Sequence, residues 1–105
     1  MDFVILITDR YLGAISMEKS FKITASEGIH ARPATLLVSS ATPYKADVQL
    51  TYNNKSVNLK SIMGMMAQGI PAGAVVTISA EGPDEAELLN KVEEVMVTQG
   101  LGEKC

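Results

Sequence analysis

The sequence predicts a two-layer α+β domain in which an antiparallel sheet carries all of its helices on one face. Segments of alternating apolar and polar residues interleave with segments of helical period, in the order β-α-β-β-α-β-α. The polar positions of the strands imply one solvated sheet face, which is typical of antiparallel sheets. The chain has 105 residues, of which 47% are hydrophobic and 5% aromatic, so one mainly aliphatic core is expected.

The first predicted strand is followed by a helix. The strand alternates until Gly28 interrupts it, and its apolar positions are Phe21, Ile23 and Ala25. The helix should end near Thr42-Pro43, because the residue before a proline disfavours helical geometry. Its apolar face, at helical spacing, is Ala34, Leu37, Val38 and Ala41.

A hairpin is predicted next. Its turn is Asn53-Asn54, because asparagine tolerates positive φ. The inward positions of the first hairpin strand are Ala46, Val48, Leu50 and Tyr52. Those of the second are Val57 and Leu59.

The remaining elements are a short helix, a strand and a final helix. Ser61 is a natural N-cap for a helix from Ile62 to Gln68 that stops at Gly69. The inward positions of the next strand are Val76, Ile78 and Ala80. Asp84 and Glu87 have the spacing of a capping pair at the start of the last helix, which Gly100 ends. The apolar face of that helix is Leu88, Leu89, Val92, Val95 and Met96.

Residues 1–16 differ from the rest of the chain. The apolar run from Phe3 to Ile7 is far too short to cross a membrane. Asp2 does not suit the positively charged start of a signal peptide. We expect residues 1–16 to be a leader or an extra strand of doubtful origin, with Met17 as an internal start. Residues 17–105 are expected to form the domain.

Composition excludes several classes of function. The single cysteine, Cys105, cannot form an internal disulfide and offers no zinc-ligand spacing, which fits a reducing cytoplasm. The net charge of −3 and the pI near 5.0 argue against direct nucleic-acid binding. No phosphate-cradling P-loop is present, and no metal, cofactor or membrane insertion is expected. Basic residues outnumber acidic ones between residues 17 and 80, where an anionic ligand should approach.

His30 is the strongest candidate for chemistry, although a lone histidine is more often a packing or surface residue. It occupies the N-cap of the first predicted helix, and Pro33 follows in the first turn. The backbone N–H groups of Ala31 and Arg32 and the Arg32 side chain then suit an anion such as phosphate. Hydrolysis is disfavoured, because no carboxylate to orient the imidazole is expected nearby. Transient phosphorylation of nitrogen and anion binding without chemistry both remain open.

A second candidate region lies around Ser61. Its side chain can serve simply as a helix cap, or it can be a regulatory phosphorylation site beside Ile62, Met63 and Met66. A helix of two turns cannot bury all of its methionines and isoleucines against one sheet. Flexible methionine side chains also suit a surface that binds several partners. Core packing and partner binding are equally consistent with this pattern.

Two segments of the sequence are distinctive in combination, Gly28 to Thr35 (GIHARPAT) and Val57 to Gly64 (VNLKSIMG). They resemble the two signatures of the HPr family. The family comprises the histidine-containing phosphocarrier proteins of the bacterial sugar phosphotransferase system, and the likeness is greatest to those of low-GC Gram-positive bacteria. It extends from Met17 to about Gly102. Asn53-Asn54 departs from the usual Asn-Gly turn, which affects only the expected hairpin stability.

The resemblance implies an open-faced β-sandwich, with four antiparallel strands in the order 1-4-2-3 and three helices on one face. It implies a cytoplasmic carrier rather than an enzyme, phosphorylated on Nδ1 of His30 by enzyme I, with Arg32 assisting. The phosphoryl group then passes to IIA domains of sugar permeases. Ser61 corresponds to the serine modified by HPr kinase/phosphorylase, whose product binds catabolite control protein A. The implied partner surface comprises Thr35, Ile62, Met63 and Met66.

Two other functions remain as alternatives. An HPr-like regulator would act only through serine phosphorylation, but such proteins replace the histidine that stands here as His30. An unrelated anion-binding module on an α+β fold would carry no covalent phosphate at all.

Overall fold

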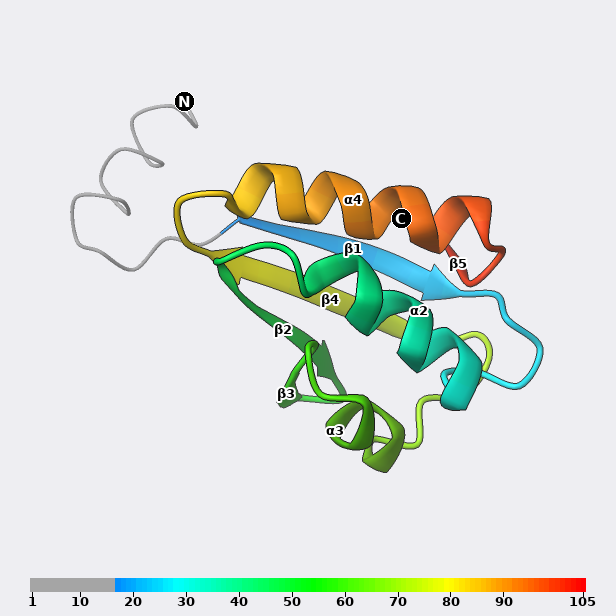
Figure 1. Ribbon diagram of the computed structural model, residues 1–105. Helices are drawn as coiled ribbons and strands as arrows, with labels where there is room; N and C mark the ends of the chain where they lie inside the picture. Colours follow the sequence, from blue (N-terminus) through cyan, green and yellow to red (C-terminus); the bar gives the residue numbers. More distant parts are fainter. Residues whose placement is uncertain (1–16) are drawn as a thin grey trace, which may run out of the picture.

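The strands pair in antiparallel fashion throughout and leave one broad face of the sheet for the helices (Figure 1). The computed structural model describes residues 17–105, so the predicted leader lies outside the described part of the chain. The elements in chain order are β1 (Met17–Ile23), α2 (Ala31–Ala41), β2 (Asp47–Tyr52), β3 (Lys55–Asn58), α3 (Ile62–Ala67), β4 (Val75–Glu81), α4 (Glu85–Thr98) and β5 (Gly102–Lys104).

The strand order within the described residues is β3-β2-β4-β1-β5. The expected order of the first four strands, 1-4-2-3, is confirmed, as are the three helices. The count of four strands is too low, because β5 adds a fifth at the outer edge of β1. It pairs Gly102, Glu103 and Lys104 with residues 21–23. Three residues are too few to show an alternating pattern, so periodicity could not reveal this strand.

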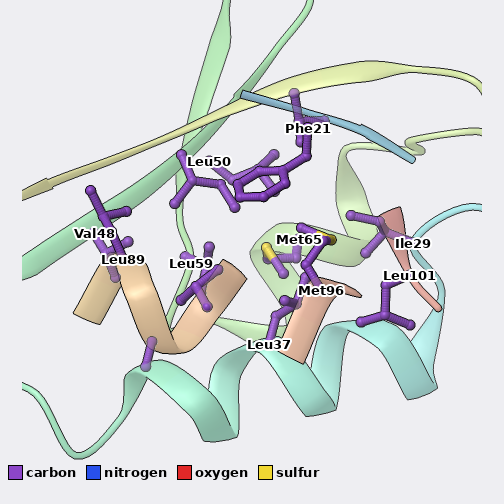
Figure 2. Close-up of a cluster of buried hydrophobic side chains, with 14 of the residues drawn as sticks. Phe21, Ile29, Leu37, Val48, Leu50, Leu59, Met65, Leu89, Met96 and Leu101 are labelled. Carbon is purple, nitrogen blue, oxygen red and sulfur yellow. The ribbon is translucent and has the colours of Figure 1, made fainter. Parts of the chain in front are cut away.

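The core lies between the helices and one face of the sheet, as the alternation predicts. The side chains of Figure 2 converge from both layers into this space. Phe21 is the one aromatic residue among the fully buried large side chains, so the core of the described chain is largely aliphatic, as expected. The helical contribution to the core includes Ala34, Leu37, Ala41, Met65, Leu88, Leu89, Val92 and Met96.

The predicted hairpin turn is confirmed. Asn53 and Asn54 have φ of 55° and 67°, the left-handed values that a tight two-residue hairpin turn requires. Leu59 was expected within the second hairpin strand but follows its end at Asn58. Leu59 is nevertheless fully buried, and its N–H donates to the carbonyl oxygen of Val48 at 3.0 Å.

The predicted capping pair of the last helix is wrong. Asp84 does occupy the N-cap of α4, but its side chain makes no capping hydrogen bond. Its two carboxylate oxygens instead accept from the backbone N–H groups of Lys45 and Ala46, each at 2.8 Å. These hydrogen bonds, led by that from Lys45, lower the pKa of Asp84 below its ordinary value of 3.8. The carboxylate therefore fastens α4 to the loop before β2.

Three features bear on the classes of function. No helix within residues 17–105 combines the length and apolarity needed to cross a bilayer. The same part of the chain holds no group of three or more His, Cys, Asp or Glu side chains placed to bind a metal ion. Cys105 is a free, exposed thiol.

Candidate functional site

A glycine sets the path of the loop that joins β1 to α2. Gly28 has φ of +69°, and its N–H donates to the carbonyl oxygen of Ala25 at 2.9 Å. A Cβ at this position would lie 2.1 Å from the carbonyl oxygen of Ile70. Both the left-handed backbone and this close approach demand glycine. The glycine of the first sequence signature therefore brings two distant backbone segments together.

The next residue anchors the loop. Ile29 is buried, and its N–H donates to the same carbonyl oxygen of Ile70 at 2.9 Å. The segment leaving α3 thus passes directly beside the start of α2 (Figure 1). Because Ile29 lies in the core, the next residue, His30, lies on the surface. The His30 side chain is 44% exposed.

His30 is the N-cap of α2, as the sequence predicts. Its carbonyl oxygen accepts the N–H of Ala34 at 3.0 Å, while its ring makes no capping hydrogen bond. Pro33 has no N–H, so Ala31 and Arg32 supply the two remaining N–H groups of the first turn. Neither has a hydrogen-bond acceptor among the described residues. These two N–H groups beside an exposed imidazole provide donors for a small anion.

Two further side chains flank this helix end. Arg32 is exposed, and no hydrogen bond or ion pair with a residue of the described chain engages its guanidinium. Thr35 is also exposed, but its hydroxyl donates to the carbonyl oxygen of Ala31 at 2.7 Å. The structure therefore brings His30, Arg32 and Thr35 together at one end of α2, with Arg32 available to an incoming anion.

Glu27 was missed by the sequence reasoning. Its Oε1 atom lies 3.9 Å from Nε2 of His30, so the expectation that no carboxylate stands near the imidazole is wrong. The signal in the sequence was that Glu27 precedes His30 by three residues, with a turn at Gly28 between them. The separation is longer than a hydrogen bond, and both side chains are substantially exposed.

Ser61 caps α3 as predicted. Its Oγ accepts the N–H of Gly64 at 3.0 Å, and the residue is partly exposed. Among the apolar side chains of α3, Met65 is fully buried. Three others lie on the surface, Ile62 at 37%, Met63 at 80% and Met66 at 44% exposure. For these side chains the geometry favours a surface patch, while Met65 belongs to the core.

Comparison with known proteins agrees with this arrangement. Residues 17–98 match the family described as the HPr component phosphorylation site of the PTS, PTS-HPr. The histidine-containing phosphocarrier protein of Mycoplasma is 35% identical to this chain, with a TM-score of 0.80. The alignment covers 82% of this chain and 98% of that one.

Two Bacillus structures are also similar. The phosphocarrier protein HPr of Bacillus anthracis is 36% identical, with 76% of this chain and 95% of that chain covered and a TM-score of 0.71. Crh of Bacillus subtilis, described as a catabolite repression protein that forms a swapped dimer, is 39% identical. Its coverage is 76% of this chain and 92% of that chain, and its TM-score is 0.63. The chain belongs to the HPr family of phosphocarrier proteins of the phosphotransferase system.

Proposed function

We propose that this chain relays a phosphoryl group from enzyme I, charged by phosphoenolpyruvate, to IIA domains of sugar permeases through a phosphohistidine at His30. One observation carries the proposal. An exposed imidazole stands at the start of α2, where two N–H groups and the Arg32 guanidinium have no partner within residues 17–105. Membership of a phosphocarrier family supports the same assignment.

The arrangement suits reversible transfer. A lone pair on the imidazole of His30 forms a bond to phosphorus, while the bond between phosphorus and the atom of enzyme I that carries it breaks. The N–H groups of Ala31 and Arg32 and the Arg32 guanidinium face the negative charge of the phosphoryl oxygens. No water-activating group is needed, since the acceptor protein supplies the next nucleophile. The chain is thus a carrier, transiently modified, rather than an enzyme acting on a small molecule.

The protein partners would dock on the surface next to His30. Ile62, Met63 and Met66 expose apolar side chains on α3, and the segment leaving α3 is hydrogen-bonded to the His30 loop. Flexible methionines can adapt to several differently shaped partners. Thr35, one turn along α2 from Ala31, would lie at the border of this surface.

Ser61 would regulate the docking. Ser61 is partly exposed, and its Oγ is the group that HPr kinase/phosphorylase would modify. A phosphate there adds up to two negative charges beside Ile62, which changes how the apolar surface meets enzyme I and catabolite control protein A. The similarity to Crh, a catabolite repression protein, supports this second role.

Phosphotransfer in vitro tests the proposal. The chain is incubated with enzyme I and labelled phosphoenolpyruvate, and a IIA domain is then added. We expect an acid-labile label on the chain that moves to the IIA domain. A purely regulatory protein would take label only from ATP and the serine kinase, in acid-stable form. An anion-binding module would take no covalent label.

A further inference from the structure

We propose that Glu27 is a positioning residue for phosphoryl transfer. Its carboxylate favours the tautomer of His30 that carries hydrogen on Nε2, which leaves Nδ1 free to accept the phosphoryl group. The inference rests on the proposed function of His30. The geometry points to it because Nε2 is the ring nitrogen that lies 3.9 Å from Oε1 of Glu27.

Few charged residues lie near Glu27 in the segments around the site. The loop of residues 24–30 meets α2, α3 and residues 68–74, and it is also hydrogen-bonded to Leu101 of the segment that leads into β5. Apart from His30, the charged residues in the first four segments are Glu27 and Arg32, and those of the last are Glu103 and Lys104 on β5, which pair with Lys22 and Phe21 of β1. The carboxylate faces Nε2, at the far end of the ring from Cβ. Nδ1 is the other ring nitrogen, bonded to Cγ, so it is not the one that faces the carboxylate.

Glu27 can therefore act on Nε2 while Nδ1 stays available to phosphorus. The carboxylate attracts an N–H dipole, and it attracts a ring with positive charge more strongly. When Nδ1 bonds to phosphorus and the bond from phosphorus to the donor atom of enzyme I breaks, the donor atom keeps that electron pair. The His30 ring then gains positive charge, and Glu27 offsets it while hydrogen stays on Nε2. When the acceptor attacks phosphorus, the electron pair returns to Nδ1 and the neutral tautomer is restored.

The expected effect is small because both side chains are exposed. Exposed ion pairs typically correspond to about a two- to fivefold change in an equilibrium, and salt screens them. We therefore expect Glu27→Ala to raise the ratio of the Nδ1–H to the Nε2–H tautomer by about two- to fivefold. Glu27→Gln, which retains an oxygen acceptor but no charge, should give a smaller rise.

¹⁵N NMR of the imidazole in the unphosphorylated protein measures this ratio directly. The spectra are recorded at about pH 9, where an ordinary imidazole is neutral. Glu87→Ala is the matched control, because Glu87 is an exposed acidic residue in the first turn of α4, at the other end of the molecule (Figure 1). The control should retain the wild-type ratio. An unchanged ratio in Glu27→Ala, or an equal change in Glu87→Ala, would overturn the proposal.

A kinetic experiment tests the consequence for transfer. Glu27→Ala should accept phosphoryl groups from enzyme I about two- to fivefold more slowly at low salt, and the difference should shrink at high salt. A shifted tautomer ratio with an unchanged transfer rate would contradict the positioning role. This proposal and the proposed function can fail separately. If the wild-type protein accepts no label from enzyme I, the carrier role itself is refuted. The tautomer ratio from NMR is measured without phosphotransfer, so it tests the role of Glu27 alone.

Discussion

The backbone N–H of Ile29 donates to the carbonyl oxygen of Ile70 at 2.9 Å, which fastens the loop carrying His30 to the segment that leaves α3. Ile29 and Ile70 are both buried, so the hydrogen bond is shielded from water. The phosphoryl-acceptor site that we propose at His30 and the docking surface on α3 are therefore held in a fixed relation. A partner that docks on the α3 surface would therefore meet His30 at a defined position.

Gly28→Ala should strongly destabilise the protein. A Cβ there would lie 2.1 Å from the Ile70 carbonyl oxygen, at a φ of +69°. Gly69→Ala is the matched control, because its φ is +63° but its Cβ would meet nothing within 4 Å. We expect a loss of about 1–2 kcal/mol for Gly69→Ala and about 3–4 kcal/mol for Gly28→Ala. Urea unfolding measures both, and equal losses would show that the close approach to Ile70 does not constrain the loop.

Arg32→Ala should leave His30 able to accept a phosphoryl group but slow the transfer about a hundredfold. The reason is that the guanidinium, free of other partners in the described chain, would stabilise charge on the moving group. Arg32→Lys keeps the charge and loses the forked donor, so its rate should be intermediate. Quenched-flow transfer from enzyme I and to a IIA domain provides the rates. Unchanged rates in both directions would mean that Arg32 only contacts solvent.

Ser61→Asp should weaken binding to enzyme I without unfolding α3. Aspartate can accept the Gly64 N–H as the serine Oγ does, so the cap is preserved. Its charge, placed next to the exposed Ile62, must be desolvated on docking. Ser61→Asn is the control, since asparagine also caps helices but carries no charge. Titration calorimetry should rank affinity as wild type and Ser61→Asn, then Ser61→Asp, then phosphoserine protein. Equal affinities would leave Ser61 as a helix cap only.

Asp84→Asn should remove part of the dependence of stability on pH. Hydrogen bonds from the N–H groups of Lys45 and Ala46 lower the pKa of Asp84 in the folded protein below its ordinary value of 3.8. The folded state therefore binds this proton less readily than the unfolded state. The resulting stability is present above 3.8 and is lost as pH falls through the lowered pKa. Asparagine keeps one acceptor oxygen, but its Nδ2 cannot accept the second N–H and its side chain does not titrate, so the variant loses the pH-dependent part of this stability.

Urea unfolding of Asp84→Asn between pH 7 and the acid range checks this expectation. The difference in unfolding free energy from wild type should shrink below about pH 4. Glu93, whose pKa is lowered by a hydrogen bond from the Lys19 ammonium, contributes in the same direction in both proteins and cancels in the comparison. Asp47→Asn is the control, because it removes an exposed carboxylate that accepts no backbone N–H from residues 17–105. A constant difference for Asp84→Asn across the pH range would contradict the assignment.

Local periodicity was sufficient to predict most of the fold. The inward positions Phe21, Leu50 and Ile78 each belong to a clear alternation, and all three are fully buried. β5 was missed because its three residues show no period. The role of Asp84 was misread because its partners are nearly forty positions away, and sequence spacing reports only nearby partners. Long-range hydrogen bonds of this kind depend on the packed tertiary structure.

The candidate site could be predicted where it depends on local sequence, and not where it depends on long-range contacts. The positions of Gly28, His30 and Pro33 at a strand-to-helix junction follow from local backbone preferences, so the N-cap was predictable. The approach of Gly28 to Ile70 was not, because four helices and strands, from α2 to α3, separate the two residues in the chain. Likewise, Met65 is buried while Met63 is exposed, and which side of α3 faces the core is fixed only by the helix's placement.

The most direct test of the account is the location of the acid-labile phosphoryl group. Wild-type protein and His30→Ala are incubated with enzyme I and labelled phosphoenolpyruvate, and the bound label is counted before and after acid treatment. The His30 ring makes no capping hydrogen bond, so the substitution should leave circular dichroism and thermal stability nearly unchanged. We predict one acid-labile phosphoryl group per wild-type chain and none on His30→Ala. Acid-labile label on folded His30→Ala would contradict the central claim.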